Sequence, residues 1–119
     1  MKKPKFEAYT RRNGKNEFLI FYDSLPLKDR EKLLATIIKV QDNGLLVSQK
    51  LKWIKKLDNN LYELRSKVGS NIQRAIYFHV ENQNYLITHG FTKKSQKTPV
   101  SEINHGKELR QEYLDDKEK

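Results

Sequence analysis

Basic side chains occur at three places in the middle of the chain where they could act together on a phosphate group. Arg65 and Arg74 each lie in a strand-like run, and Lys93 and Lys94 follow a third such run. A planar guanidinium can bind two phosphate oxygens at once, and lysines nearby can stabilise negative charge on them. The same residues also fit an ordinary basic surface, with Arg65 paired to a neighbouring glutamate and the lysine pair in a solvated turn.

Arg74 stands out because of its neighbours. Strict alternation along its run places it on the same face as Ile72, Ile76 and Phe78. An unpaired charge on an apolar face is costly. Arg74 therefore lies either at a frayed strand end or in a polar site.

Two ring side chains close to the lysine pair could also contribute. Phe91 could stack on an exposed nucleic-acid base, although a place in the core fits it almost equally well. His89 falls on the same side of its run as Phe91 and Lys93, and its ordinary pKa near 6.5 suits proton transfer. A lone histidine in a strand is nevertheless more often structural. The chain has no acidic pair suited to acid–base work and no metal-ligand cluster, so we expect no metal site and no cofactor.

Composition narrows the class of protein. The 119 residues include no cysteine, which excludes a disulfide scaffold and thiolate chemistry. No run approaches the ~20 apolar residues that span a membrane, so we expect a cytoplasmic protein. The formal charge is +9, and residues 50–97 carry ten basic and three acidic residues. Such a localised excess favours a polyanionic partner.

Hydrophobic spacing predicts an α+β fold that forms one domain over residues 1–119. Residues 27–43 repeat apolar side chains at helical spacing, with Leu34 and Ile38 among those expected to face inward. Residues 45–60 look like a lysine-rich connector, and residues 17–22 are ambiguous between helix and strand. The other predicted elements are a short edge strand near residues 6–9, strands at 61–68, 72–80 and 85–92, and a last helix at 100–114 capped by Ser101.

Several segments, in order, resemble the RelE/ParE toxin superfamily, in particular its HigB-like, phage-associated branch. They are FYDSLP (21–26), LYELR (61–65), QRAIYF (73–78), HGFTKKSQKTP (89–99) and ELRQEYL (108–114). The resemblance implies a helix at residues 15–25. It also implies a RelE-like fold, a small twisted antiparallel sheet with two N-terminal helices packed on one face, and a C-terminal helix.

The resemblance also implies an activity. Toxins of this kind belong to type II toxin–antitoxin systems, and many are metal-independent endoribonucleases that cleave mRNA in the ribosomal A site. The implied catalytic residues are Arg65, Arg74, Lys93, Lys94 and Phe91, with His89 as a possible proton-transfer group. The implied RNA- and ribosome-binding residues are Lys52, Lys55, Lys56, Lys67 and Lys97.

The implied partners are the 70S ribosome carrying mRNA and a cognate HigA-like antitoxin with a helix-turn-helix domain. Operator DNA would be contacted only through that antitoxin, and no membrane is involved. Two other functions remain open on the sequence. One is a ParE-like toxin that inhibits DNA gyrase, and the other is a basic protein that binds nucleic acid without chemistry.

Overall fold

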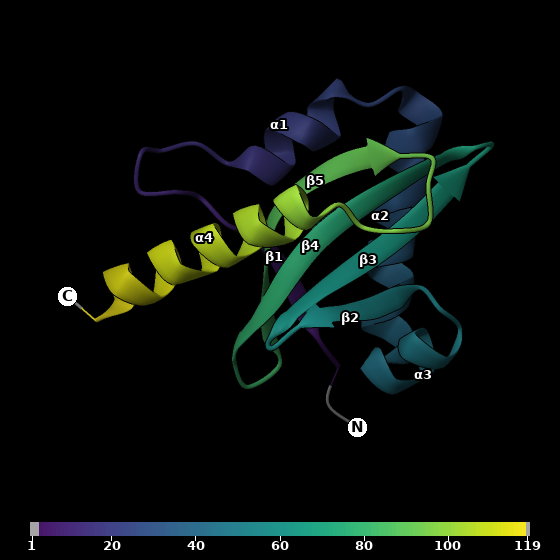
Figure 1. Ribbon diagram of the computed structural model, residues 1–119. Coiled ribbons are helices and arrows are strands. Elements are labelled where there is room, and N and C mark those ends of the chain that lie inside the picture. Colours follow the sequence, from purple (N-terminus) through teal and green to yellow (C-terminus); the bar gives the residue numbers. More distant parts are fainter. Residues whose placement is uncertain (1–2, 119) are drawn as a thin grey trace.

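The computed structural model describes residues 3–118 and has one five-stranded sheet with helices on both sides (Figure 1). The strands lie in the order β1-β5-β4-β3-β2, and all neighbours are antiparallel except β1 and β5. The predicted α+β class and RelE-like arrangement are therefore confirmed. The edge strand expected near residues 6–9 is present as β1, and its parallel pairing with β5 was not predicted. The elements are β1 Lys5–Ala8, α1 Glu17–Ser24, α2 Leu27–Asn43, α3 Leu45–Lys50, β2 Ile54–Asp58, β3 Leu61–Val68, β4 Asn71–Glu81, β5 Asn84–Lys93 and α4 Val100–Lys117.

The ambiguous residues 17–22 are helical, as the resemblance implied. Asn16 caps α1, because its side chain accepts a hydrogen bond from the backbone N–H of Leu19 at 3.1 Å. Phe18 then packs into the core. Gly90 of β5 lets α1 approach closely, since a Cβ there would lie 2.4 Å from the ring of Phe21. Tertiary packing thus overrides the strand-like composition.

Helix α2 spans the predicted residues, but the side chains it buries differ in part. Leu33, Ile37 and Val40 are buried, whereas Leu34 and Ile38 are each 46% exposed. Both sets follow the helical period, and only the first faces the sheet. The expectation that Leu34 and Ile38 face inward is therefore wrong.

The segment at residues 45–60 is more than a connector. It forms α3 and the edge strand β2, which pairs with β3 from Ile54 opposite Leu64. The strand escaped prediction because an edge strand tolerates solvated lysines, and Lys55 and Lys56 are exposed.

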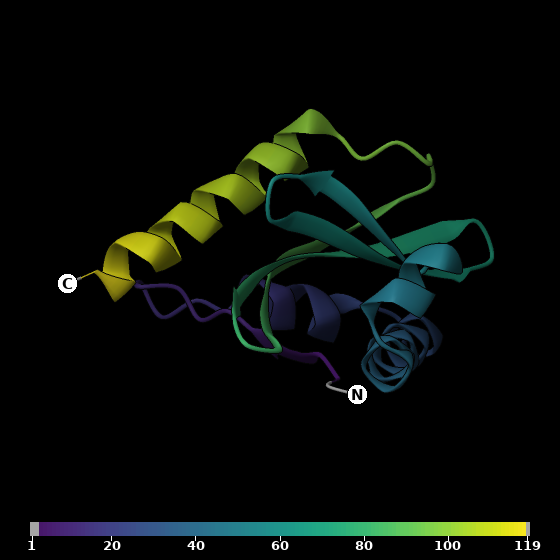
Figure 2. The same ribbon diagram turned by 90° about the horizontal axis from the view of Figure 1, so that it is seen from below.

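The sheet separates two apolar clusters (Figure 2). Helices α1 and α2 cover one face, and α4 covers part of the other, where Leu61 and Ile76 are fully buried. Gly106 allows this packing, because a Cβ there would lie 2.9 Å from Ile76. Ser101 does not cap α4. The helix begins at Val100 after Pro99, so Ser101 already lies in the first turn. No helix in the described part of the chain is long and apolar enough to cross a membrane.

Candidate active site

Strand register brings three of the predicted site residues together. Arg65 of β3 lies opposite Arg74 of β4, and Arg74 lies opposite Phe91 of β5. Directly paired residues point to the same face of a sheet. All three side chains therefore lie on the face that α4 partly covers, beside the loop of residues 94–99 that joins β5 to α4.

A buried carboxylate lies between the two arginines. Glu63 is fully buried, and its Oε2 accepts a hydrogen bond from Arg65 Nε at 2.7 Å. Its Oε1 lies 3.6 Å from Arg74 Nε and accepts a hydrogen bond from the Thr98 hydroxyl at 2.8 Å. One negative charge thus faces two positive ones, and the three side chains together have a net positive charge.

Arg74 does not reach the surface. Its side chain is fully buried, and its terminal nitrogens donate to the main-chain carbonyls of Lys97, at 3.2 Å, and Ser95. Burial lowers the pKa of Arg74, Glu63 raises it and Arg65 lowers it, but arginine stays protonated at neutral pH. The Arg74 guanidinium therefore holds the loop in place through these carbonyls. The sequence prediction had instead placed Arg74 in direct contact with the phosphate.

Arg65 is the more accessible of the two arginines. Its side chain is 18% exposed, and its NH1 donates to the Gln96 side chain at 3.1 Å while NH2 donates to the Gln96 carbonyl. A guanidinium has five N–H donors, and these contacts with that to Glu63 use three. Two donors are left for a ligand.

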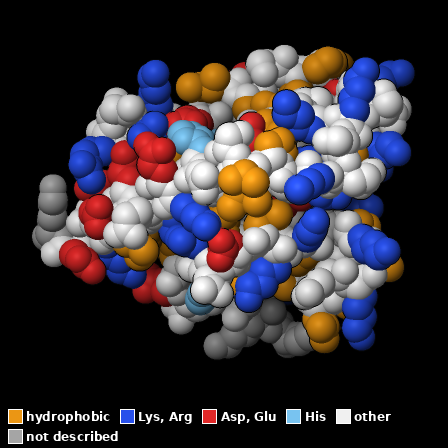
Figure 3. Space-filling model, in the orientation of Figure 1, with side chains coloured by type: hydrophobic (Ala, Val, Ile, Leu, Met, Phe, Trp, Pro, Cys, Tyr) orange, Lys and Arg blue, Asp and Glu red, His pale blue; other side chains and the backbone are white. Residues whose placement is uncertain are grey.

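The loop above the arginines carries exposed cations. Lys94 and Lys97 lie in it and Lys93 ends β5, and all three are exposed. Figure 3 shows Lys and Arg side chains gathered over the half of the molecule that contains this loop, whereas acidic side chains gather over α4. The predicted lysines Lys52, Lys55, Lys56 and Lys67 are also exposed, on β3, β2 and the turn before β2.

The two ring side chains lie deeper than the lysines. Phe91 is 8% exposed, and the guanidinium carbon of Arg74 lies 5.8 Å from its ring centre. His89 is 5% exposed, with Nδ1 2.8 Å from the Thr88 hydroxyl and Nε2 3.2 Å from Glu102. Burial and the nearby His105 lower the pKa of His89 to about 4, against a smaller rise from Glu17. The imidazole is therefore neutral at pH 7.

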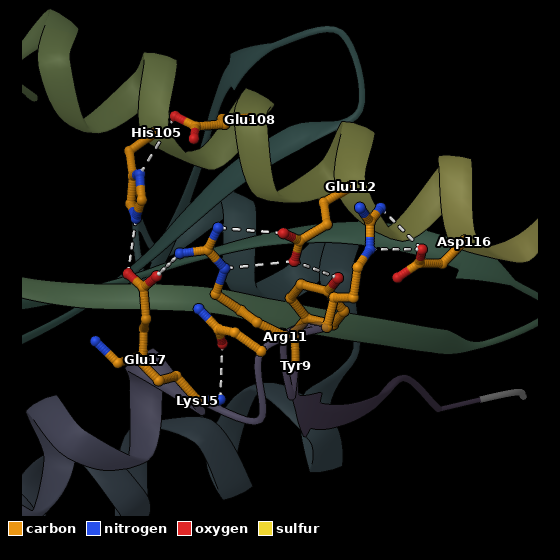
Figure 4. A network of polar contacts seen from close by, with 10 residues as sticks. Tyr9, Arg11, Lys15, Glu17, His105, Glu108, Glu112 and Asp116 are labelled. Atoms are coloured by element: carbon orange, nitrogen blue, oxygen red, sulfur yellow. Dashed lines mark hydrogen bonds and ion pairs between the residues drawn. The ribbon is translucent and has the colours of Figure 1, made fainter.

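A separate polar network fixes α4, and with it the far end of the loop (Figure 4). Glu112 accepts hydrogen bonds from Tyr9, at 2.8 Å, and from Arg11, at 3.1 Å. Glu17 accepts from Arg11 at 2.7 Å and lies 2.7 Å from Nε2 of His105. The Arg11 hydrogen bond lowers the pKa of Glu112 despite an opposing effect of burial. The network therefore ties α4 to the segment between β1 and α1.

Apart from Lys97, the sequence did not single out the loop residues that contact the two arginines and Glu63. Gln96 contacts Arg65, and Thr98 contacts Glu63. The contacts to Arg74 are made by main-chain carbonyls. Main-chain carbonyls leave no side-chain signature, so only the chain path reveals these contacts. In residues 3–118, no three His, Cys, Asp or Glu side chains are close enough together to hold a metal ion.

Comparison with protein families decides which group the molecule falls into. The family described as "phage derived protein Gp49-like (DUF891)" matches residues 21–111, which include every element from α2 to β5. The chain belongs to this Gp49-like family. The family lies within the RelE/HigB-like group of toxins from toxin–antitoxin systems, and membership implies an antitoxin partner. No curated protein matches the chain.

Proposed function

We propose that this Gp49-like protein is a HigB-like toxin of a type II toxin–antitoxin pair, acting in the cytoplasm as a metal-independent, ribosome-dependent endoribonuclease on mRNA in the A site. The observation that carries the proposal is the position of the Arg65 side chain. It lies half-buried with two unused donors, beside a loop of exposed lysines and above a buried carboxylate that orients it. Toxins of the group to which the family belongs are often endoribonucleases.

The proposed reaction needs only groups of this kind. The 2′-hydroxyl oxygen of one nucleotide attacks the adjacent phosphorus and gives its proton to a water molecule, and the bond from phosphorus to the 5′-oxygen breaks. The products are a 2′,3′-cyclic phosphate and a 5′-hydroxyl, whose oxygen takes up a proton from water. Arg65, Lys93 and Lys94 stabilise the negative charge that gathers on the phosphoryl oxygens.

We assign Arg74 and Phe91 to positioning. Arg74 holds the carbonyls of the loop that carries Lys94 and Lys97, and Phe91 packs against Arg74. Both ring nitrogens of His89 face protein partners, so we place it among the residues that shape the site rather than those that move the proton. Holding the 2′-oxygen in line with the leaving oxygen falls to the ribosome, and we expect little cleavage of free RNA.

The exposed lysines around the site provide the proposed docking surface. Lys52, Lys55, Lys56, Lys67 and Lys97 would contact ribosomal RNA phosphates. A HigA-like antitoxin with acidic residues over this surface would compete with the ribosome. The acidic side chains over α4 lie away from the docking surface (Figure 3).

Mapping mRNA 5′-ends after induction tests the proposal. Wild-type protein should stop growth and produce A-site cuts only while translation is active. Arg65→Ala should abolish both effects. Arg12→Ala, which removes an arginine 54% exposed beside α4, should abolish neither. DNA breaks without mRNA cuts would identify a gyrase inhibitor instead, and growth arrest that survives Arg65→Ala would favour binding without chemistry.

A further inference from the structure

A hollow of about 360 Å³ opens beside Arg65, at the point where strand β2 stops short of the end of β3. The pairing of β2 begins at Ile54, and the Trp53 carbonyl accepts the Arg65 backbone N–H at 2.8 Å. From Ser66 onward no strand in residues 3–118 pairs with β3 on that side, and α2 flanks the gap. We call this space the Trp53 hollow; its lining includes Trp53, Ser66, Arg65 and four lysines, Lys32, Lys39, Lys52 and Lys67.

The charges around the Trp53 hollow are unbalanced. No Asp or Glu of residues 3–118 lines it, and none of its four lysines has an ion pair among the described residues. The ammonium of Lys39 lies 4.5 Å from the centre of the Trp53 ring, which gives that cation a fixed place at the wall. Five cations around one space attract an anion.

The hollow also has an unused polar group. Ser66 is 4% exposed, and its hydroxyl has no hydrogen-bond partner in the described structure. A buried hydroxyl without a partner is unfavourable, because it has lost its hydrogen bonds to water. An anionic oxygen in the hollow would accept the hydrogen bond that Ser66 lacks.

Arg65 belongs both to the wall of the hollow and to the candidate active site. An anion in the hollow therefore lies next to the phosphate that Arg65 is proposed to bind. Successive phosphates of one polynucleotide strand provide such neighbouring anions.

We propose that the Trp53 hollow is an RNA phosphate subsite, which holds the strand by a backbone phosphate next to the one at Arg65. The inference rests on the proposed function and extends it to Lys32, Lys39 and Ser66. Lys39 and Lys32 neutralise the phosphate, and Ser66 donates a hydrogen bond to it. The strand is thereby fixed on both sides of Arg65.

The test uses the full chain and a fluorescein-labelled RNA hexamer whose 2′-oxygens are all methylated, so that it cannot be cleaved. Trp53 is the single tryptophan, so its emission reports directly on the hollow. Binding of the hexamer should change that emission. The double variant Lys32→Gln/Lys39→Gln should weaken binding at least tenfold and flatten its salt dependence.

Two further variants separate the subsite from general charge and from folding. Lys28→Gln removes an exposed lysine of the same helix outside the hollow and should change the affinity less than twofold. Ser66→Ala removes a hydroxyl without a partner, so it should fold normally and still weaken binding several-fold.

The outcomes are distinguishable from those for the proposed function. Unchanged Trp53 emission on RNA binding, or equal affinities for the double variant and Lys28→Gln, would overturn the subsite. Inorganic phosphate, at the same total concentration of phosphate groups as the hexamer, should change the Trp53 emission less than the hexamer does. An equal change would show that the hollow is not an RNA site. Hexamer binding that depends on the hollow, together with failure to cleave mRNA on ribosomes, would leave the subsite standing and refute the nuclease.

Discussion

Two polar clusters on the α4 side of the sheet use similar residues but differ in charge balance. In the cluster that ties α4 to the N-terminal segment, Arg11 and Arg12 face Glu17, Glu112 and Asp116 at short distances. In the cluster beside β3 and β4, one buried carboxylate, Glu63, faces two arginines, and exposed lysines surround them. In the first cluster, which we call the paired cluster, each of these charged groups lies within 3.1 Å of an opposite charge. The other cluster has a surplus of positive charge and free donors. We take the first as structural and the second as functional.

The largest effect on stability is expected from Glu63→Gln. The change leaves Arg74 buried without a counter-charge, and losing one partner of a buried ion pair costs about 3 kcal/mol. Urea denaturation of the purified variant measures this free energy of unfolding. A loss below about 1 kcal/mol would mean that Glu63 does not hold the arginines in place.

The pH dependence of stability tests the burial of His89. Its pKa is about 4 in the folded protein and near 6.5 when unfolded, so between these values the unfolded chain binds more protons. Stability should therefore fall as pH drops below 6.5, by up to about 1.4 kcal/mol per pH unit from this group.

The measurement is urea denaturation between pH 7 and 5.5, where the carboxylates, whose usual pKa is near 4.5, stay mostly ionised in both states. His89→Asn should remove most of the slope. An equal slope in the variant would show that the buried imidazole is not its source.

A smaller effect on stability is expected in the paired cluster. Arg11→Ala removes contacts to Glu17 and Glu112 that are partly exposed, and it should cost about 1 kcal/mol of stability. Growth arrest should persist, because none of these residues reaches the loop lysines. Thermal melting of the Arg11→Ala variant measures the loss of stability, and an induction assay measures growth arrest. Loss of toxicity in a folded variant would contradict a purely structural role for this cluster.

The smallest effect is expected from Arg12→Ala. The Arg12–Asp116 pair is exposed, so neither the melting temperature nor growth arrest should change measurably. A clear drop in the melting temperature or loss of growth arrest would show that the N-terminal segment does more than hold α4 in place.

Sequence periodicity could predict most of the fold but not its irregular parts. The strands at β3, β4 and β5 and the helix α2 have strong repeats, and their predicted bounds differ from the structure by at most one residue. Helix α3 and strand β2 were missed because six helical residues and a lysine-rich edge strand carry little periodic signal.

The candidate site could likewise be predicted only in part from the sequence. Alternation and motif resemblance pointed to Arg65, Arg74 and Phe91, and the strand register places them together. The burial of Arg74 could not be predicted, because it depends on carbonyls of a loop without regular structure. The Trp53 hollow exists because β2 begins at Ile54, a boundary that the sequence did not reveal.

Cleavage on purified ribosomes is the direct test of whether Arg65 takes part in cutting mRNA. Programmed 70S ribosomes and the same mRNA without ribosomes would be incubated with wild-type protein, Arg65→Ala and Arg12→Ala, and the new ends would be mapped. We predict A-site cuts with 5′-hydroxyl ends on ribosomes only. The rate should be lower by about 10²-fold or more for Arg65→Ala and unchanged for Arg12→Ala. Equal cutting of naked mRNA by the wild type, or wild-type cutting by folded Arg65→Ala, would contradict it.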